Sequence, residues 1–210
     1  MDEQVKAKPT IFLVDDDADV RDALSLFLDS AGLHVIPFDS AIAFLSFYKP
    51  EMPGCLILDI DMPNMSGIEL QDALVQKQIP IPIIFLTAHG TVPLTVKAFK
   101  SGATDFIEKP FNDQVLLQSI EKALEKDVGY REENEKRTAA NNRIEQLTPR
   151  EKEVMNRVVT GLSSKEIARE LQISHRTVDI HRSRIMVKMQ VKSLPELIAL
   201  TTQIKSGLAR

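Results

Sequence analysis

Apolar runs and amphipathic stretches alternate along the first 125 residues of the chain. The apolar runs have the length of strands, and they occupy residues 10–14, 33–38, 55–58, 81–87 and 104–107. After each run, apolar residues recur every three or four positions, which is the spacing of one helix face. Five strand–helix units in succession predict a doubly wound, five-stranded parallel sheet, a fold of the α/β class.

Acidic residues follow the first and third apolar runs. Asp15 and Asp16 come directly after the first run, and Asp59 and Asp61 follow the third. In the flavodoxin-like strand order 2-1-3-4-5, the first and third strands are neighbours, and a ligand crevice opens beyond their carboxyl ends. This topology predicts that Asp15, Asp16 and Asp59 converge beside one crevice.

Two further polar residues lie at the ends of the fourth and fifth runs, Thr87 and Lys109. Carboxylates gathered without partners repel one another, and a hard divalent cation such as Mg²⁺ removes that conflict. A lysine ammonium and a threonine hydroxyl both suit phosphoryl oxygens. Each residue alone would be read as a helix cap or a solvated side chain. Together they predict a phosphoryl-transfer site with a metal ion, a carboxylate nucleophile, a lysine and a hydroxyl. A cis peptide bond before Pro110 would aim Lys109 inward, which the sequence leaves open.

Charge divides the chain into an acidic front and a basic tail. Residues 1–126 carry 10 Lys and Arg against 19 Asp and Glu, whereas residues 147–210 carry 12 against 6. A basic tail favours a polyanionic partner. The single cysteine, Cys55, lies inside an apolar run and fits a reducing compartment. We find no signal peptide and no run of membrane-spanning length, so we expect a cytoplasmic protein without membrane contact.

Residues 10–125 resemble the receiver domain of two-component response regulators. The resemblance rests on Val14-Asp15-Asp16-Asp17, Leu58-Asp59-Ile60-Asp61-Met62-Pro63, Met65-Ser66-Gly67, Thr87-Ala88 and Lys109-Pro110-Phe111. It implies that Asp59 is the phosphoacceptor and that Mg²⁺, with Mn²⁺ as a substitute, is the cofactor. The implied metal ligands are Asp15, Asp16, Asp59 and the backbone carbonyl of Asp61. The implied phosphoryl-binding and switch residues are Thr87, Lys109 and Phe106.

The segment 127–146 is polar and rich in helix-forming residues. It has no sustained heptad seam, so a stable coiled coil is not supported. We therefore expect a receiver domain over residues 1–126, a helical linker over 127–146 and a second domain over 147–210.

Helix start and stop signals punctuate the second domain. Thr148, Pro149 and Glu151 form a capping box with proline at the first helical position, and Gly161 marks the end of that helix. Three more amphipathic helices follow, beginning at Ser163, at residue 175 and at residue 195. The tight turn between the second and third of these four helices, and the Arg- and His-rich third helix, predict a helix-turn-helix.

The third helix of this domain has an apolar stripe and a polar face. Val178, Ile185 and Met189 are expected to point inward. In a major groove Asp179 would accept from cytosine, and the basic residues would mostly meet phosphates. His181 is interpreted as a structural or phosphate-bonding residue, since no partner at metal spacing exists.

Residues 147–200 are similar to the LuxR-type helix-turn-helix of FixJ/NarL-class response regulators. The carriers of the similarity are Leu147-Thr148-Pro149-Arg150-Glu151, Gly161, Lys165-Glu166-Ile167-Ala168, Thr177-Val178-Asp179-Ile180-His181 and Lys188-Met189. By this resemblance Asp179, Ile180 and Ser183 face the bases. The full set of expected DNA-binding residues is Lys165, Ser174, Arg176, Thr177, Asp179, Ile180, His181, Arg182, Ser183, Arg184 and Lys188.

The two resemblances imply a DNA-binding transcriptional regulator, switched by phosphorylation of Asp59, and not a turnover enzyme. Its implied partners are a sensor histidine kinase, double-stranded DNA, a second copy of the chain after phosphorylation, and RNA polymerase. Two alternatives stay open. A phosphohydrolase of the haloacid-dehalogenase type would use Asp59 and Asp61 but leaves Asp15, Asp16 and the basic tail without a role. A constitutive DNA binder would use the receiver only as a dimerisation scaffold.

Overall fold

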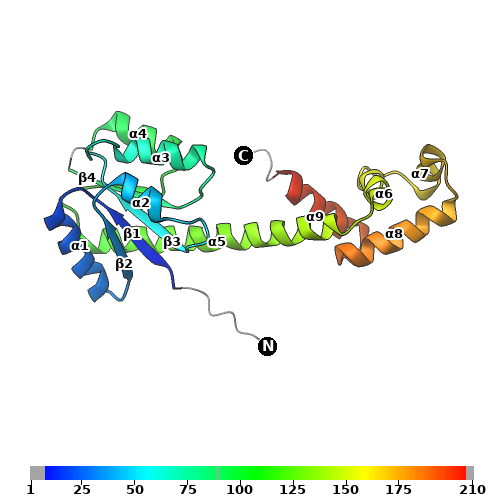
Figure 1. Cartoon of the computed structure of the whole chain (residues 1–210), viewed down its shortest axis with the longest axis horizontal. Helices are drawn as coiled ribbons and strands as arrows, with labels where there is room; N and C mark the ends of the chain where they lie inside the picture. Colours follow the sequence, from blue (N-terminus) through cyan, green and yellow to red (C-terminus); the bar gives the residue numbers. More distant parts are fainter. Residues whose placement is uncertain (1–7, 89, 207–210) are drawn as a thin grey trace. The chain divides into compact units, whose positions relative to one another are not determined.

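The computed structural model describes residues 8–88 and 90–206 (Figure 1). The chain forms two compact units, Met1–Arg131 and Glu132–Arg210. Each unit has its own hydrophobic core.

The first unit is a five-stranded parallel sheet. Its strands are β1 (Thr10–Val14), β2 (His34–Phe38), β3 (Gly54–Leu58), β4 (Ile83–Thr87) and β5 (Asp105–Glu108). They pair in the order β2-β1-β3-β4-β5, every pair in parallel. The predicted α/β fold and strand order are confirmed. Pro37 lies in the edge strand β2, where a missing backbone N–H is tolerated.

Helices cover both faces of this sheet. They are α1 (Ala18–Ser30), α2 (Ala41–Phe47), α3 (Gly67–Gln76), α4 (Val92–Lys100) and α5 (Asp113–Glu145). Alternate residues of each central strand point to opposite faces. Phe12 and Leu56 belong to the core under α2, α3 and α4, whereas Ile11 and Ile57 belong to the core under α1 and α5. Because both faces of the sheet are buried, the strands appear in the sequence as unbroken apolar runs.

Helix α5 continues without a break through the segment expected to be a linker. It has 33 residues, and the first unit extends along it to Arg131. Our sequence-based domain end at residue 126 differs because Asp127 and Arg131 bond to backbone atoms of the first unit.

The second unit contains the end of α5 and four helices: α6 (Pro149–Val159), α7 (Ser164–Leu171), α8 (His175–Met189) and α9 (Leu194–Ser206). Capping boxes at Thr148 and Ser163 open α6 and α7. Gln172 ends α7 in the left-handed conformation at φ 53°, and three residues separate α7 from α8. Val154, Ile167 and Val178 lie in one core, so α6, α7 and α8 pack together. The predicted helical second domain is confirmed.

Candidate functional site

The ends of β1 and β3 bring two buried carboxylates to one lysine. Asp15 is 2% exposed and Asp59 is 8% exposed. Lys109, just after β5, donates from its ammonium to Asp15 Oδ2 at 2.7 Å and to Asp59 Oδ1 at 3.0 Å. The backbone N–H of Asp17 donates to Asp15 Oδ1 at 3.0 Å, and that of Asp61 donates to Asp59 Oδ2 at 2.7 Å. We call Asp15, Asp59 and Lys109 the acidic crevice.

Burial and charge shift the titration of this group. Burial raises the pKa of Asp59 above its ordinary value, although the hydrogen bond and charge of Lys109 act in the opposite direction. Burial lowers the pKa of Lys109, but its hydrogen bonds to Asp15 and Asp59 outweigh this effect and the pKa is raised. Lys109 is therefore a fixed cation at neutral pH. It can hold a phosphoryl oxygen beside the Asp59 carboxylate.

Asp16 directly follows Asp15 in the chain, and Asp61 lies two residues after Asp59. Both residues are exposed. Among the residues described, no three acidic, histidine or cysteine side chains form a group that could hold a metal ion. Mg²⁺ does not require such a cage, because it keeps several waters and takes one or two carboxylates together with phosphate oxygens. Asp15 and Asp59 supply two carboxylates against one lysine, so the donor set fits a hydrated Mg²⁺.

Thr87 is the last residue of β4, and Phe106 lies in β5, the strand that Lys109 follows. Thr87 is fully buried, and its carbonyl accepts the backbone N–H of Lys109 at 2.8 Å. Phe106 is half-buried, with its ring centroid 6.1 Å from that of Phe85. The peptide bond between Lys109 and Pro110 is cis. The strand ends thus bring Thr87 and Lys109 together, while the coupling of Phe106 to Thr87 stays a prediction.

Gly67 lets α3 begin directly against Asp59. Its backbone N–H donates to the carbonyl of Ile60 at 3.0 Å. A Cβ atom at Gly67 would overlap the backbone carbonyl oxygen of Asp59. The position therefore requires glycine for space, and any larger residue would displace the backbone that carries Asp59.

Gly67→Ala is expected to lower the free energy of unfolding by about 1–3 kcal/mol, as overpacking does, and to slow phosphorylation of Asp59. Thermal unfolding and the rate of mass gain with acetyl phosphate measure the two effects. Gly129→Ala is the control, since Gly129 lies in α5 with no heavy atom within 4 Å of an added Cβ. It should be neutral or stabilising by up to about 1 kcal/mol. Wild-type stability in Gly67→Ala would contradict the packing described.

Helix α8 exposes one continuous face. The exposed residues on this face are Arg176, Asp179, Ile180, Ser183, Arg184 and Val187. The predicted inward stripe, Val178, Ile185 and Met189, is buried. Ser174 caps the helix by accepting the N–H of Thr177, and Lys165 is exposed on α7. We call the six exposed residues the α8 face.

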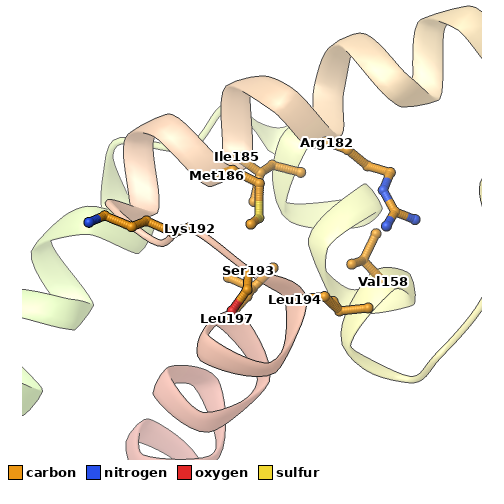
Figure 2. A pocket seen from close by; sticks show the side chains of 8 residues that line it. All are labelled: Val158, Arg182, Ile185, Met186, Lys192, Ser193, Leu194 and Leu197. Atoms are coloured by element: carbon orange, nitrogen blue, oxygen red, sulfur yellow. The ribbon is translucent and has the colours of Figure 1, made fainter.

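Arg182 lies on the other side of α8. It is half-buried among the inward residues, and Nη1 donates to Ser164 Oγ at 3.4 Å. Figure 2 shows its side chain beside Val158 and Leu194, at a pocket between α6, α8 and α9. The pocket measures about 180 Å³, below the size that usually holds a ligand. Our sequence-based placement of Arg182 on the DNA side differs from this arrangement.

Lys188 makes contacts within the domain, and His181 is not fully exposed. Lys188 Nζ donates to Glu151 Oε2 at 2.7 Å and to the carbonyl of Gln146 at 3.2 Å. Glu151 is 2% exposed and also accepts the backbone N–H of Thr148 at 2.9 Å. His181 is half-buried, and its Nδ1 is buried with no hydrogen-bond partner in the part of the chain that the structure describes. The expectation that Lys188 meets phosphates conflicts with its ion pair to Glu151.

Two features of the sites were not found in the sequence. Val187 is 77% exposed on the α8 face, a position that helical spacing from Ile180 and Ser183 already indicates. The Lys188–Glu151 ion pair joins residues that lie 37 positions apart, so no local signal identifies it.

Comparisons with known proteins match both units. Residues 11–121 match the response regulator receiver domain, and residues 145–201 match the luxR family of bacterial regulatory proteins. The chain is 44% identical over 193 residues to the transcriptional regulatory protein FixJ of Bradyrhizobium diazoefficiens, which covers 92% of this chain and 94% of FixJ. Nodulation protein W of the same organism is 42% identical over 200 residues, with 94% and 87% covered.

Solved structures agree with these matches. The response regulator StyR superposes with a TM-score of 0.81 at 46% identity, covering 94% of this chain and all of StyR. Full-length FixJ from B. japonicum gives a TM-score of 0.56 at 42% identity, covering 95% of this chain and 98% of FixJ. None of the described helices is long and apolar enough to cross a membrane. The chain therefore belongs to the FixJ-type response regulators, transcriptional regulators of two-component systems in which a LuxR-type DNA-binding domain follows a receiver domain.

Proposed function

We propose that Asp59 takes a phosphoryl group from a sensor histidine kinase and that the resulting charge switches the α8 face for DNA binding. The observation that carries the proposal is the Lys109 ammonium shared by Asp15 and Asp59. An oxygen of Asp59 attacks phosphorus, the bond from phosphorus to the donor breaks, and Lys109 holds a phosphoryl oxygen. Thr87 is the neighbouring hydroxyl for a second oxygen, and Phe106 is the residue whose ring would follow Thr87.

The proposed cofactor is Mg²⁺, with Mn²⁺ as a substitute. The carboxylates of Asp15 and Asp59 would hold it, with Asp16 and the backbone carbonyl of Asp61 as further ligands. When bound, the ion supplies positive charge for the oxygens of the transferred group. The two buried carboxylates opposite a single lysine support this donor set.

The proposed regulation of transcription requires three partners: DNA, a second copy of the chain and RNA polymerase. The α8 face offers two arginines for phosphates, and Asp179 offers carboxylate acceptors for a cytosine amino group. Helix α4 exposes Val92, Val96 and Phe99, at 78%, 45% and 46%. Apolar residues exposed together on one helix support a protein interface, and we assign it to dimerisation after phosphorylation. Contact with RNA polymerase is proposed on the resemblance to the family alone. The family is also that of a regulator and not of a phosphohydrolase.

Asp59→Asn is expected to take up no phosphoryl group from acetyl phosphate and Mg²⁺, whereas the wild type gains the mass of one. Folding should survive the change. Because the folded protein raises the pKa of Asp59, the ionised form is destabilising above the unfolded pKa of about 3.9. Removing the charge at neutral pH should leave the free energy of unfolding equal or higher. Intact mass and thermal unfolding measure both results, and an equal mass gain in Asp59→Asn would refute the assignment.

Arg176→Ala and Arg182→Ala should separate the two sides of α8. The logarithm of the DNA-binding constant falls linearly with the logarithm of salt concentration. Losing one phosphate contact makes this negative slope less steep by about 0.9. We expect that change for Arg176, on the α8 face, and an unchanged slope for Arg182, because it faces the pocket. Fluorescence anisotropy with a bound duplex between low and moderate salt gives both slopes. The reverse pattern would show that the DNA side of α8 has been misassigned.

A further inference from the structure

Asp127 occupies a position on α5 where the helical spacing predicts an apolar residue. Leu116, Ile120 and Ala123 are buried against the sheet, and Asp127 follows four residues later with 2% exposure. A carboxylate in such a place needs partners to offset its desolvation. Its Oδ2 atom accepts the backbone N–H of Gly54 at 2.9 Å. The core stripe of α5 therefore ends in a polar contact with the first residue of β3.

Arg131 extends this contact to the loop before β3. Its Nε–H donates to Asp127 Oδ2 at 2.7 Å, and its two terminal nitrogens donate to the carbonyls of Pro50 at 3.0 Å and Met52 at 2.5 Å. The planar guanidinium can serve three acceptors at once, which a lysine cannot do with the same geometry. We call Asp127 and Arg131 the helix clamp.

Gly54 gives the helix clamp a rigid attachment. Its φ is +146°, and a Cβ atom there would overlap the carbonyl oxygen of Thr10, so β3 begins directly against the backbone of β1. Gly54 opens β3, and Asp59 directly follows the other end of the same strand. The helix clamp and the acidic crevice therefore lie at opposite ends of one buried strand, about 17 Å apart along it.

Arg131, the second residue of the helix clamp, is also the last residue of the first unit. Four of the next five residues, 132–136, are exposed. An exposed helical segment of this length has little stability of its own in water. The helix clamp therefore holds the last turn of α5 in the first unit to β3 and to the loop before it.

We propose that Asp127 and Arg131 are positioning residues that fix the departure of α5 from the receiver, so that phosphorylation of Asp59 changes DNA affinity. This rests on the proposed function. If the two residues only satisfied the first N–H of β3, their role would be merely structural. Losing their contacts would then lower stability without altering how phosphorylation changes DNA affinity. The two roles therefore differ in a measurable way.

The test compares Arg131→Met and Arg131→Lys with the control Lys136→Met, an exposed position on the same helix. For each full-length chain, intact mass gives the fraction phosphorylated by acetyl phosphate. The DNA probe is a duplex selected from a random library by the wild type. Fluorescence anisotropy gives the DNA affinity of each chain with and without phosphorylation, and hence the ratio of the two affinities. We expect equal phosphorylation throughout, but a ratio reduced by about threefold or more in Arg131→Met and by less in Arg131→Lys. Amide exchange over 128–135 should be about tenfold faster in Arg131→Met.

A wild-type ratio in both Arg131 variants, at equal phosphorylation, would overturn the proposal, as would an equal loss in Lys136→Met. Should Arg131→Met lose the receiver fold, Arg131→Lys decides, because it keeps the charge and the helix propensity. The proposed function is wrong if the wild type gains no mass with acetyl phosphate, or if its DNA affinity does not change on phosphorylation. In that case there is no change in DNA affinity for the helix clamp to influence.

Discussion

Lys109→Met is expected to lower the free energy of unfolding of the receiver by about 2–3 kcal/mol at neutral pH. The change leaves Asp15 and Asp59 buried beside each other without the cation that both now share. The loss should stay near the low end for buried ion pairs, because each carboxylate keeps one backbone N–H. Chemical denaturation of the full chain gives the value. Acetyl phosphate should also phosphorylate this variant far more slowly.

The pH dependence of this effect has a definite sign. The folded protein raises the pKa of Lys109, so its contribution is complete below the unfolded pKa of about 10.4 and is lost as pH rises through the folded value. The difference between wild type and Lys109→Met should therefore be constant near pH 7 and shrink in strong alkali. Lys122→Met, an exposed position on α5, is the matched control and should be neutral. Equal stability of Lys109→Met and wild type would show that the lysine is not needed to balance the carboxylates.

Glu151→Ala should destabilise the second unit by about 2–3 kcal/mol. Roughly 1 kcal/mol comes from the lost capping box with Thr148. The rest comes from the ion pair with Lys188, discounted because the Lys188 side chain is 33% exposed. Hydrogen exchange of the α6 and α8 amides in the full chain reports the loss. Glu153→Ala is the control, because Glu153 pairs with Arg150 at the surface and should cost under about 0.5 kcal/mol.

Acid should reduce the difference between Glu151→Ala and wild type, because it removes the ion pair with Lys188. Burial raises the pKa of Glu151, but the contacts with Lys188 and Thr148 outweigh it and the pKa is lowered. Such a carboxyl stabilises the fold above its unfolded pKa of about 4.3, and the contribution disappears as pH falls through the folded value. A difference that persisted unchanged below both values would contradict the ion-pair assignment.

The placement of the acidic crevice could be predicted because strand ends are a property of topology. Asp15, Asp59, Thr87 and Lys109 each follow or end a separate strand, and the doubly wound order brings those ends together. The sharing of one lysine by two carboxylates, and their distances, depend on side-chain packing that no spacing rule provides.

The sequence-based prediction that Arg182 faces DNA differs from the structure for another reason. Arg182 lies four residues after Val178 and three before Ile185, so helical spacing already places it with the inward stripe. A charged side chain is expected to point outward, but a long arginine can cover apolar surface while keeping its head polar. Asp127 was missed for the same reason, since it continues the stripe of Ile120 and Ala123. At both positions a charged residue on an apolar stripe makes a buried or half-buried contact.

The central claim is that phosphorylation of Asp59 controls DNA binding, and one ratio tests it most directly. The dissociation constant of the full chain for a selected duplex is measured by anisotropy with and without acetyl phosphate and Mg²⁺, for wild type and Asp59→Asn. We predict that affinity rises by about tenfold in the wild type and is unchanged in Asp59→Asn. Equal affinities in all four conditions would identify a constitutive DNA binder, and an equal gain in Asp59→Asn would place the switch at another residue.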